Sequence, residues 1–213
     1  MEVNIKELKP ASSEILRYMG WKRKMPGDET YDNLVIEIEE KINEILSKVS
    51  PKFEFTYVNI EENKELCEKL FVGENINRFI CDNEGVYLAV ATLGFQFENI
   101  LKSAGAGNAL DLLMLEAVGT ELVEKLMDYI EELIKLKMDS TKSSRFSPGY
   151  GEWELFHQQT ILDFLRADRI GVYLNESNLM IPRKSVTAVI KMDNFDSGCK
   201  FCNKKNCEFK KNI

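Results

Sequence analysis

The stretch GVYLAVATLG, residues 85–94, is almost continuously apolar and is rich in β-branched and aromatic side chains. A short run of this kind is typical of a strand that is covered on both faces of a sheet. We therefore expect a buried interior strand here. The rest of the chain must then supply a layer of structure on each face of that strand.

Further strands are predicted on both sides of this run in the sequence. KFEFTYVNI, residues 52–60, alternates with period two, and SVTAVIKM, residues 185–192, has the pattern of a closing strand. IGVYLN, residues 170–175, is expected to form a short strand, and ESNLMIP, residues 176–182, to form a loop.

Apolar residues at spacings of three and four predict several helices, of which the longest covers residues 108–137. It would hold about 30 residues and be about 45 Å long at 1.5 Å per residue. Shorter helices are expected after Ser12 and Ser13, which would cap the first of them, and over residues 31–49, 62–71 and 154–168. Because helices and strands do not alternate regularly, an α+β fold with a mixed or antiparallel sheet and long helices is expected.

Composition limits the class of protein. The chain has 213 residues, 44% of them hydrophobic and 30% charged, which is typical of one folded domain with at most a small appendage. Its net charge of −7 opposes binding to nucleic acid or to an anionic membrane surface. The first 20 residues lack the apolar core of a leader peptide, and no apolar run approaches the roughly 20 residues that span a bilayer. We therefore expect a cytoplasmic protein with no nucleic-acid or membrane partner.

Two sequence features that resemble catalytic motifs are better explained otherwise. AGAGN, residues 104–108, follows a predicted helix rather than a strand, so it is expected to be a turn between helices and not a nucleotide-binding loop. His157 is the only histidine, and no Gly-x-Ser-x-Gly elbow supplies a nucleophile for it. We expect His157 to be a surface or interface residue of a helix.

The cysteines allow two interpretations. Cys199, Cys202 and Cys207 form a C-x2-C-x4-C pattern, which suits zinc or an iron–sulfur cluster. A fourth ligand would come from Cys67, Cys81 or His157, or the site would stay open. The alternative is a flexible tail of reduced thiols, which an odd total of five cysteines and a reducing compartment also suit.

The long predicted helix carries a row of acidic residues, which we expect to form a solvated face. They are Glu121, Glu124, Asp128, Glu131 and Glu132.

The loop RFSPGYG, residues 145–151, has the parts of a binding site for a charged, planar ligand. Arg145 can pair with a carboxylate through two nitrogens, and Pro148 and Gly149 favour a tight turn that exposes backbone groups. Tyr150 offers a ring face to an adenine or to a cation. The alternative is a plain turn with an arginine salt bridge, and the residue types alone leave both interpretations open.

This loop resembles the R-x-x-P-G-Y hallmark of the S-adenosylmethionine (AdoMet)-binding activation domain of cobalamin-dependent methionine synthase. A second segment, ESNLMIPRKSV at residues 176–186, is similar to that family's E-S-x-x-M-x-P-x-x-S-V sequence. The matching residues there are Glu176, Ser177, Met180, Pro182, Ser185 and Val186. LVEKL resembles the family's helix before the loop and places Glu124 at its ligand-contacting glutamate. The resemblance covers roughly residues 85–192, and the chain has no match to the family's N-terminal ligand aspartate.

The resemblance implies a division of the chain and a role for each matched residue. Residues 1–84 would be the N-terminal portion of the same domain, residues 85–192 the AdoMet-binding core, and residues 193–213 a cysteine-rich tail. Within the core, Arg145 would hold the AdoMet carboxylate and Glu124 a polar or cationic part of the ligand. The backbone near Ser147 and Gly149 would line the pocket, and Tyr150 would face the corrin.

The resemblance also implies a partner, because the chain lacks the D-x-H-x-x-G motif that binds a corrinoid. A free-standing reactivation subunit would support reductive methylation of cob(II)alamin held by a methionine synthase subunit, with a flavodoxin or ferredoxin as electron donor. It would not be active alone. The alternatives are a reactivator of another corrinoid methyltransferase, or a metal or iron–sulfur redox protein that uses the three cysteines of the tail.

Overall fold

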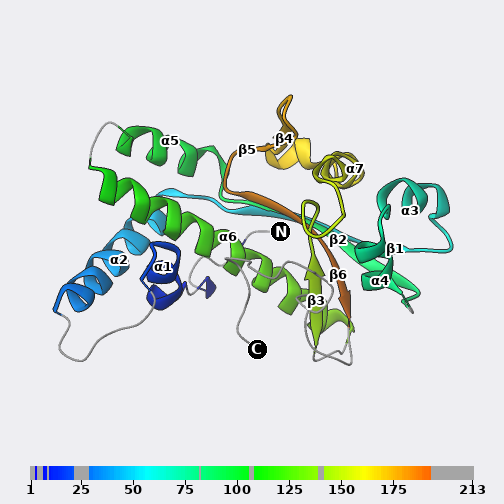
Figure 1. Ribbon diagram of the computed structural model, residues 1–213, viewed down its shortest axis with the longest axis horizontal. Helices are drawn as coiled ribbons and strands as arrows, with labels where there is room; N and C mark the ends of the chain where they lie inside the picture. Colours follow the sequence, from blue (N-terminus) through cyan, green and yellow to red (C-terminus); the bar gives the residue numbers. More distant parts are fainter. Residues whose placement is uncertain are drawn as a thin grey trace.

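The computed structural model describes residues 3, 7–8, 10–21, 29–81, 83–105, 108–138 and 142–192. The helices are α1 (Ser12–Tyr18), α2 (Glu29–Lys48), α3 (Lys64–Leu70), α4 (Glu74–Ile80), α5 (Gly94–Ala104), α6 (Ala109–Met138) and α7 (Gln158–Leu165), with 3₁₀ turns at Leu155–His157 and Ala167–Ile170. The strands are β1 (Lys52–Asn59), β2 (Gly85–Thr92), β3 (Ser143–Phe146), β4 (Tyr173–Leu174), β5 (Met180–Ile181) and β6 (Ser185–Met192) (Figure 1).

The main sheet has the strand order β1-β2-β6-β3, and every neighbouring pair is antiparallel. β2 lies inside the sheet, with β1 on one side and β6 on the other, and its residues from Val86 to Thr92 are buried. The predicted interior strand is therefore confirmed, and so is the α+β class. β4 and β5 form a separate two-stranded hairpin.

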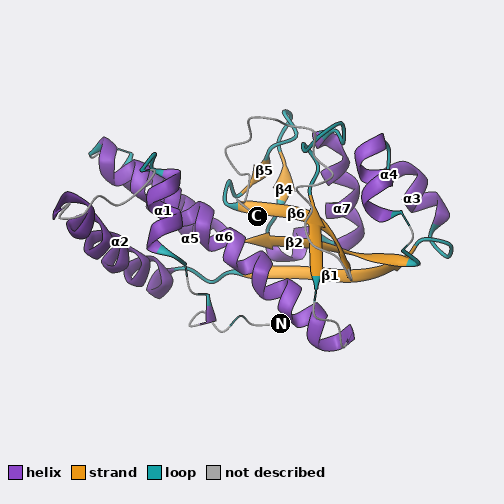
Figure 2. Ribbon diagram, turned by 60° about the horizontal axis from the view of Figure 1, so that its bottom comes forward, coloured by secondary structure: helices purple, strands orange, loops and turns teal. Residues whose placement is uncertain are grey.

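Alternating side chains of β2 pack into two different layers. Val86, Leu88 and Val90 share one hydrophobic cluster with residues of α3, α4 and α7. Tyr87 and Ala89 belong to a cluster that includes Leu126 and Ile130 of α6, on the other face of the sheet. Figure 2 shows α6 running across this second face, away from α3, α4 and α7. A third cluster joins α1, α2 and α5 to the first half of α6.

Helix α6 contributes residues to the second and the third of these clusters. It contributes none to the cluster that contains α3, α4 and α7. It spans 30 residues, which confirms the predicted long helix to within one residue at each end. The turn predicted at AGAGN is confirmed at its described ends, because α5 ends at Ala104 and α6 begins at Ala109. No helix in the described part of the chain combines the length and the apolar character needed to cross a membrane.

Several local predictions are wrong. Ser12 and Ser13 lie inside α1 rather than capping it; the N-cap is Ala11, which makes no side-chain capping bond. The helix predicted over residues 154–168 is shortened to α7 by a 3₁₀ turn at each end. The loop predicted over residues 176–182 contains β5, which pairs with β4. The short elements α4 and β3 were not predicted.

We predict that Gly119→Ala destabilises the protein. Gly119 lies in α6 where a Cβ atom would overlap the ring of Phe97 of α5, which is fully buried. The expected loss, after allowing for the better helix propensity of alanine, is about 1–2 kcal/mol in the free energy of unfolding, measured by urea denaturation. Gly105→Ala is the control, since its Cβ would meet nothing nearer than 3.5 Å. Equal stability of the two variants would contradict the close packing of α5 on α6.

Candidate functional site

The loop after β3 begins with a tight turn over residues 147–150. The backbone N–H of Tyr150 donates a hydrogen bond to the carbonyl of Ser147 over 3.2 Å, and Gly149 has a φ of 92°. Proline at the second position and a positive-φ glycine at the third are the residues that a type II turn requires. The Pro148-Gly149 pair therefore fixes this turn, as the sequence predicted, and leaves Gly149 and Tyr150 exposed.

The remainder of the loop is anchored to the layer of α3 and α4. Trp153 is buried, and its Nε1 donates a hydrogen bond to the carbonyl of Leu70 over 2.8 Å. The buried Asn75 accepts a hydrogen bond from the backbone N–H of Glu152 over 2.9 Å. Gly151 has a φ of 58°, and a Cβ there would collide with the Asn75 side chain. The loop is thus held at its base while its tip remains accessible.

Arg145 lies on β3 and binds three carboxylates of α6. Its Nη2 donates to Oε2 of Glu124 over 2.6 Å, and its Nη1 donates to Oδ1 of Asp128 over 2.8 Å and to Glu131. The spacing of these acids at i, i+4 and i+7 puts them on one face of the helix. We call Arg145, Glu124, Asp128 and Glu131 the arginine cluster. The alternative interpretation of the loop, a turn with an arginine salt bridge, expected an ion pair of Arg145. Such pairs are present, and they involve three acids.

The neighbouring carboxylates keep Arg145 charged. Burial alone would lower the pKa of the guanidinium, but the charges of Glu131, Glu124 and Asp128 outweigh this effect and raise the pKa above its ordinary value. The side chain of Arg145 is 17% exposed, so one part of it remains accessible.

The prediction that the acidic row of α6 is a solvated face is wrong for two of its members. Glu121 is 3% exposed and Glu131 is 9% exposed. Glu121 accepts a hydrogen bond from the backbone N–H of Ala11 over 3.3 Å and lies 3.8 Å from Nζ of Lys125. Burial raises the pKa of Glu121, and this effect outweighs both of these contacts. Glu132, by contrast, is exposed and pairs with Lys135.

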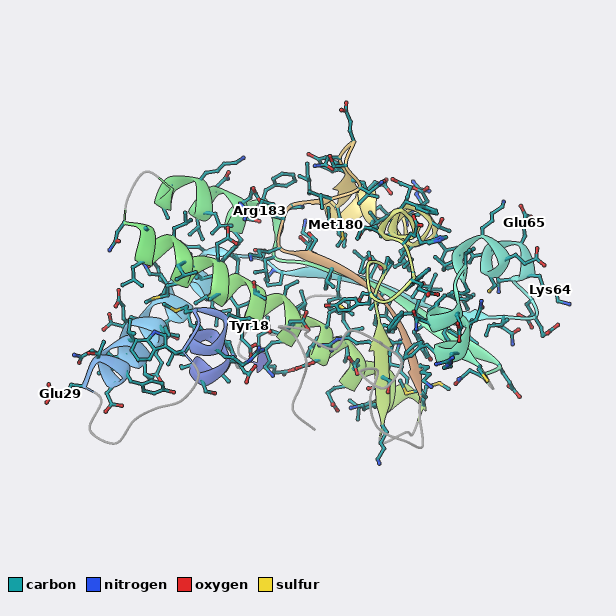
Figure 3. All side chains as sticks on the ribbon, in the orientation of Figure 1. Tyr18, Glu29, Lys64, Glu65, Met180 and Arg183 are labelled. Carbon is teal, nitrogen blue, oxygen red and sulfur yellow. The ribbon has the colours of Figure 1, made fainter. Side chains whose placement is uncertain are left out.

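Helix α1 lies beside the same face of α6. Tyr18 is near the end of α1, and Figure 3 shows it next to α6. Burial raises the pKa of the Tyr18 phenol, and the negative charge of Glu124 raises it further. The arginine cluster is therefore bordered by α1 on one side and by β3 on the other. Tyr18 was not predicted as a site residue, because no pattern in the sequence indicates that α1 packs against α6 at this point.

The second motif segment, residues 176–186, is anchored to the first half of α6. Arg183 and Lys184 both pair with Glu116, the latter over 2.8 Å, and Nζ of Lys184 donates to Thr120 Oγ1 over 2.9 Å. Ser185 hydrogen-bonds to Thr92 of β2 over 2.8 Å. These contacts fix the connection between β5 and β6 against α6, one to two turns before Glu124.

His157 is buried, so the prediction of a surface position is wrong. It is 3% exposed, and its ring stacks on that of Trp153 and makes a tilted contact with that of Phe156. Burial lowers the pKa of the imidazole, because it disfavours the charged form of the ring. Its role in the described structure is to hold the base of the loop.

Cys199, Cys202 and Cys207 lie outside the described residues. Among the residues that the structure does describe, no group of three or more His, Cys, Asp or Glu side chains is arranged to hold a metal ion. Cys67 is a buried free thiol, and Cys81 is exposed.

A separate surface hollow of about 420 Å³ lies between α2, α5 and α6. Its lining includes Lys41 and Asp111, which form an ion pair of 3.0 Å. None of its lining residues belongs to the arginine cluster.

Comparisons with known proteins agree with this architecture. No protein-family model matches the chain, and no curated protein is similar to it in sequence. Among solved structures, the MetH reactivation domain bound to AdoHcy is similar with a TM-score of 0.65, covering 90% of this chain and 77% of that one. This chain has the fold of the MetH reactivation domain. Since the two sequences are only 14% identical, the similarity shows a shared fold, as the resemblance of the two motifs predicted.

We predict that Glu121→Gln stabilises the protein at pH 8 and that the gain disappears in acid. A carboxyl whose folded-state pKa is raised costs stability while it is ionised, and this cost vanishes as pH falls through the folded pKa to below the unfolded value of about 4.3. Urea denaturation from pH 8 to pH 4 would measure the difference. Glu132→Gln on the exposed side of α6 is the control. A gain that is independent of pH would contradict the assignment.

Proposed function

We propose that this chain binds AdoMet at the arginine cluster and acts as a free-standing reactivation subunit for a partner cobalamin-dependent methionine synthase. One observation carries the proposal: a nearly buried arginine on the R-x-x-P-G-Y loop faces Glu124, in a chain with the fold of a domain that binds AdoHcy.

The donors of Arg145 suit an amino-acid ligand. Its Nη1 donates hydrogen bonds to Asp128 and Glu131, and its Nη2 donates one to Glu124. Its Nε–H donates to none of the described residues. The guanidinium therefore keeps a donor for the carboxylate of AdoMet. The ammonium group of the same ligand can pair with Glu124, whose side chain is 36% exposed. Arg145 and Glu124 together therefore complement the negative carboxylate and the positive ammonium of the methionine part of AdoMet.

The turn over residues 147–150 would bind the rest of the ligand. In the proposed site the backbone near Ser147 and Gly149 would line the pocket. The ring of Tyr150, which is exposed, would lie towards the corrin of the partner. Because the base of the loop is fixed by Trp153 and Asn75, the turn needs little ordering when a ligand binds.

The chemistry requires positioning more than acid or base catalysis. A flavodoxin or ferredoxin supplies one electron, which reduces the partner's cob(II)alamin to cob(I)alamin. The cobalt electron pair then attacks the methyl carbon of AdoMet, so that a cobalt–carbon bond forms, the carbon–sulfur bond breaks and its electron pair stays on sulfur in AdoHcy. This chain contributes by holding the sulfonium methyl group towards the corrin.

We predict that AdoMet binds to the isolated chain and that Arg145→Lys weakens binding at least about tenfold, because an ammonium cannot replace the planar fork. Calorimetric titration measures this, and circular dichroism confirms that the variant is folded. Arg78→Ala, which removes an exposed arginine of α4 paired with Glu74, is the control. Equal affinity of wild type and Arg145→Lys would contradict the proposed carboxylate contact.

We also predict that the chain restores a methionine synthase subunit whose cobalamin has become cob(II)alamin. With AdoMet and reduced flavodoxin under anaerobic conditions, the visible spectrum should change to that of methylcobalamin, and one AdoHcy should form per cobalamin. Omission of this chain or of AdoMet should prevent the change. Methylation at the same rate without this chain would contradict the proposed role.

A further inference from the structure

Among the described side chains that form ion pairs around the proposed ligand site, negative charge exceeds positive charge. Four carboxylates, those of Glu121 and of Glu124, Asp128 and Glu131 in the arginine cluster, share two cations, Arg145 and Lys125. Nζ of Lys125 lies 3.0 Å from Asp128, so both cations are already engaged by acids of α6. The excess is two negative charges when all four acids are ionised. It is one if the buried Glu121 is protonated.

Resting on the proposed function, we infer that these carboxylates make the site selective for the positive sulfonium of AdoMet over the neutral thioether of AdoHcy. The two ligands differ by one methyl group and one charge. A methyl group alone discriminates weakly, whereas a unit charge beside partly buried acids interacts strongly, because the surrounding dielectric is low. The charge of the cluster is then the specificity determinant.

This selectivity has a consequence for turnover. Transfer of the methyl group removes the positive charge from the ligand, and the bond electrons remain on sulfur. The product is then held by the same amino-acid contacts but without attraction between the sulfur and the carboxylates. The loss of this attraction favours release of AdoHcy and its replacement by AdoMet.

The experiment compares the affinities of AdoMet, AdoHcy and sinefungin, an analogue with a cationic amine in place of the sulfonium. We expect AdoMet and sinefungin to bind about tenfold more tightly than AdoHcy at low salt. The ratio should fall as sodium chloride rises from about 0.05 M to about 0.5 M, because added ions screen the charges. Asp128→Asn should reduce the ratio severalfold, and Glu132→Gln, on the exposed side of the same helix, should leave it unchanged.

The outcomes separate this inference from the proposed function. If none of the three ligands binds, the proposed function fails. If AdoMet and AdoHcy bind equally at low salt, the AdoMet site stands and the inference is overturned. A preference for AdoMet that neither salt nor Asp128→Asn changes also overturns it, because the preference would then come from shape. The salt series uses the wild-type chain, so the test does not depend on the folding of a variant.

Discussion

A mostly buried guanidinium is stable only when negatively charged groups pair with it. In this chain, three carboxylates on one face of α6 form ion pairs with Arg145. The ion pairs connect the edge strand β3 to the middle of the longest helix. The same helix packs its apolar side chains on the sheet and on α1, α2 and α5. The start of the loop that follows β3 is therefore positioned by this interaction.

The two ends of that loop are fixed by different forces. At its start, Arg145 is held by charge against α6. At its end, Trp153 and His157 are held by burial against the layer of α3, α4 and α7. Between them, the Pro148-Gly149 turn carries Tyr150 to the surface. A rigid frame with an accessible tip is what a protein needs when its contribution to a reaction is to position a ligand for a partner.

The parts of the fold that were predictable are those that the chain specifies locally. The apolar run 85–94 and the long helical periodicity each contain enough repeats to identify an element. Strand β3 was not predicted, because its four residues, Ser143–Phe146, form a strand only through pairing with the edge of β6. The burial of Glu121 and Glu131 was not predictable either. Helical spacing puts acids on one face, but the positions of α1 and β3 decide whether that face meets water.

The same distinction applies to the candidate site. The motif residues from Arg145 to Tyr150 could be identified by their resemblance to a known family, and the type II turn followed from Pro148-Gly149. Asp128 and Tyr18 belong to the site only through contacts between elements that are distant in sequence. The spacing of Glu124, Asp128 and Glu131 was visible in the sequence, yet nothing in the sequence showed that Arg145 would face it.

A crystal structure of the chain grown with AdoHcy would show whether the ligand binds at the arginine cluster. We predict ligand density between α1, α6 and the turn over residues 147–150, with the ligand carboxylate at Arg145 and its ammonium at Glu124. Density in the hollow between α2, α5 and α6, against Lys41 and Asp111, with the arginine cluster unchanged, would contradict it.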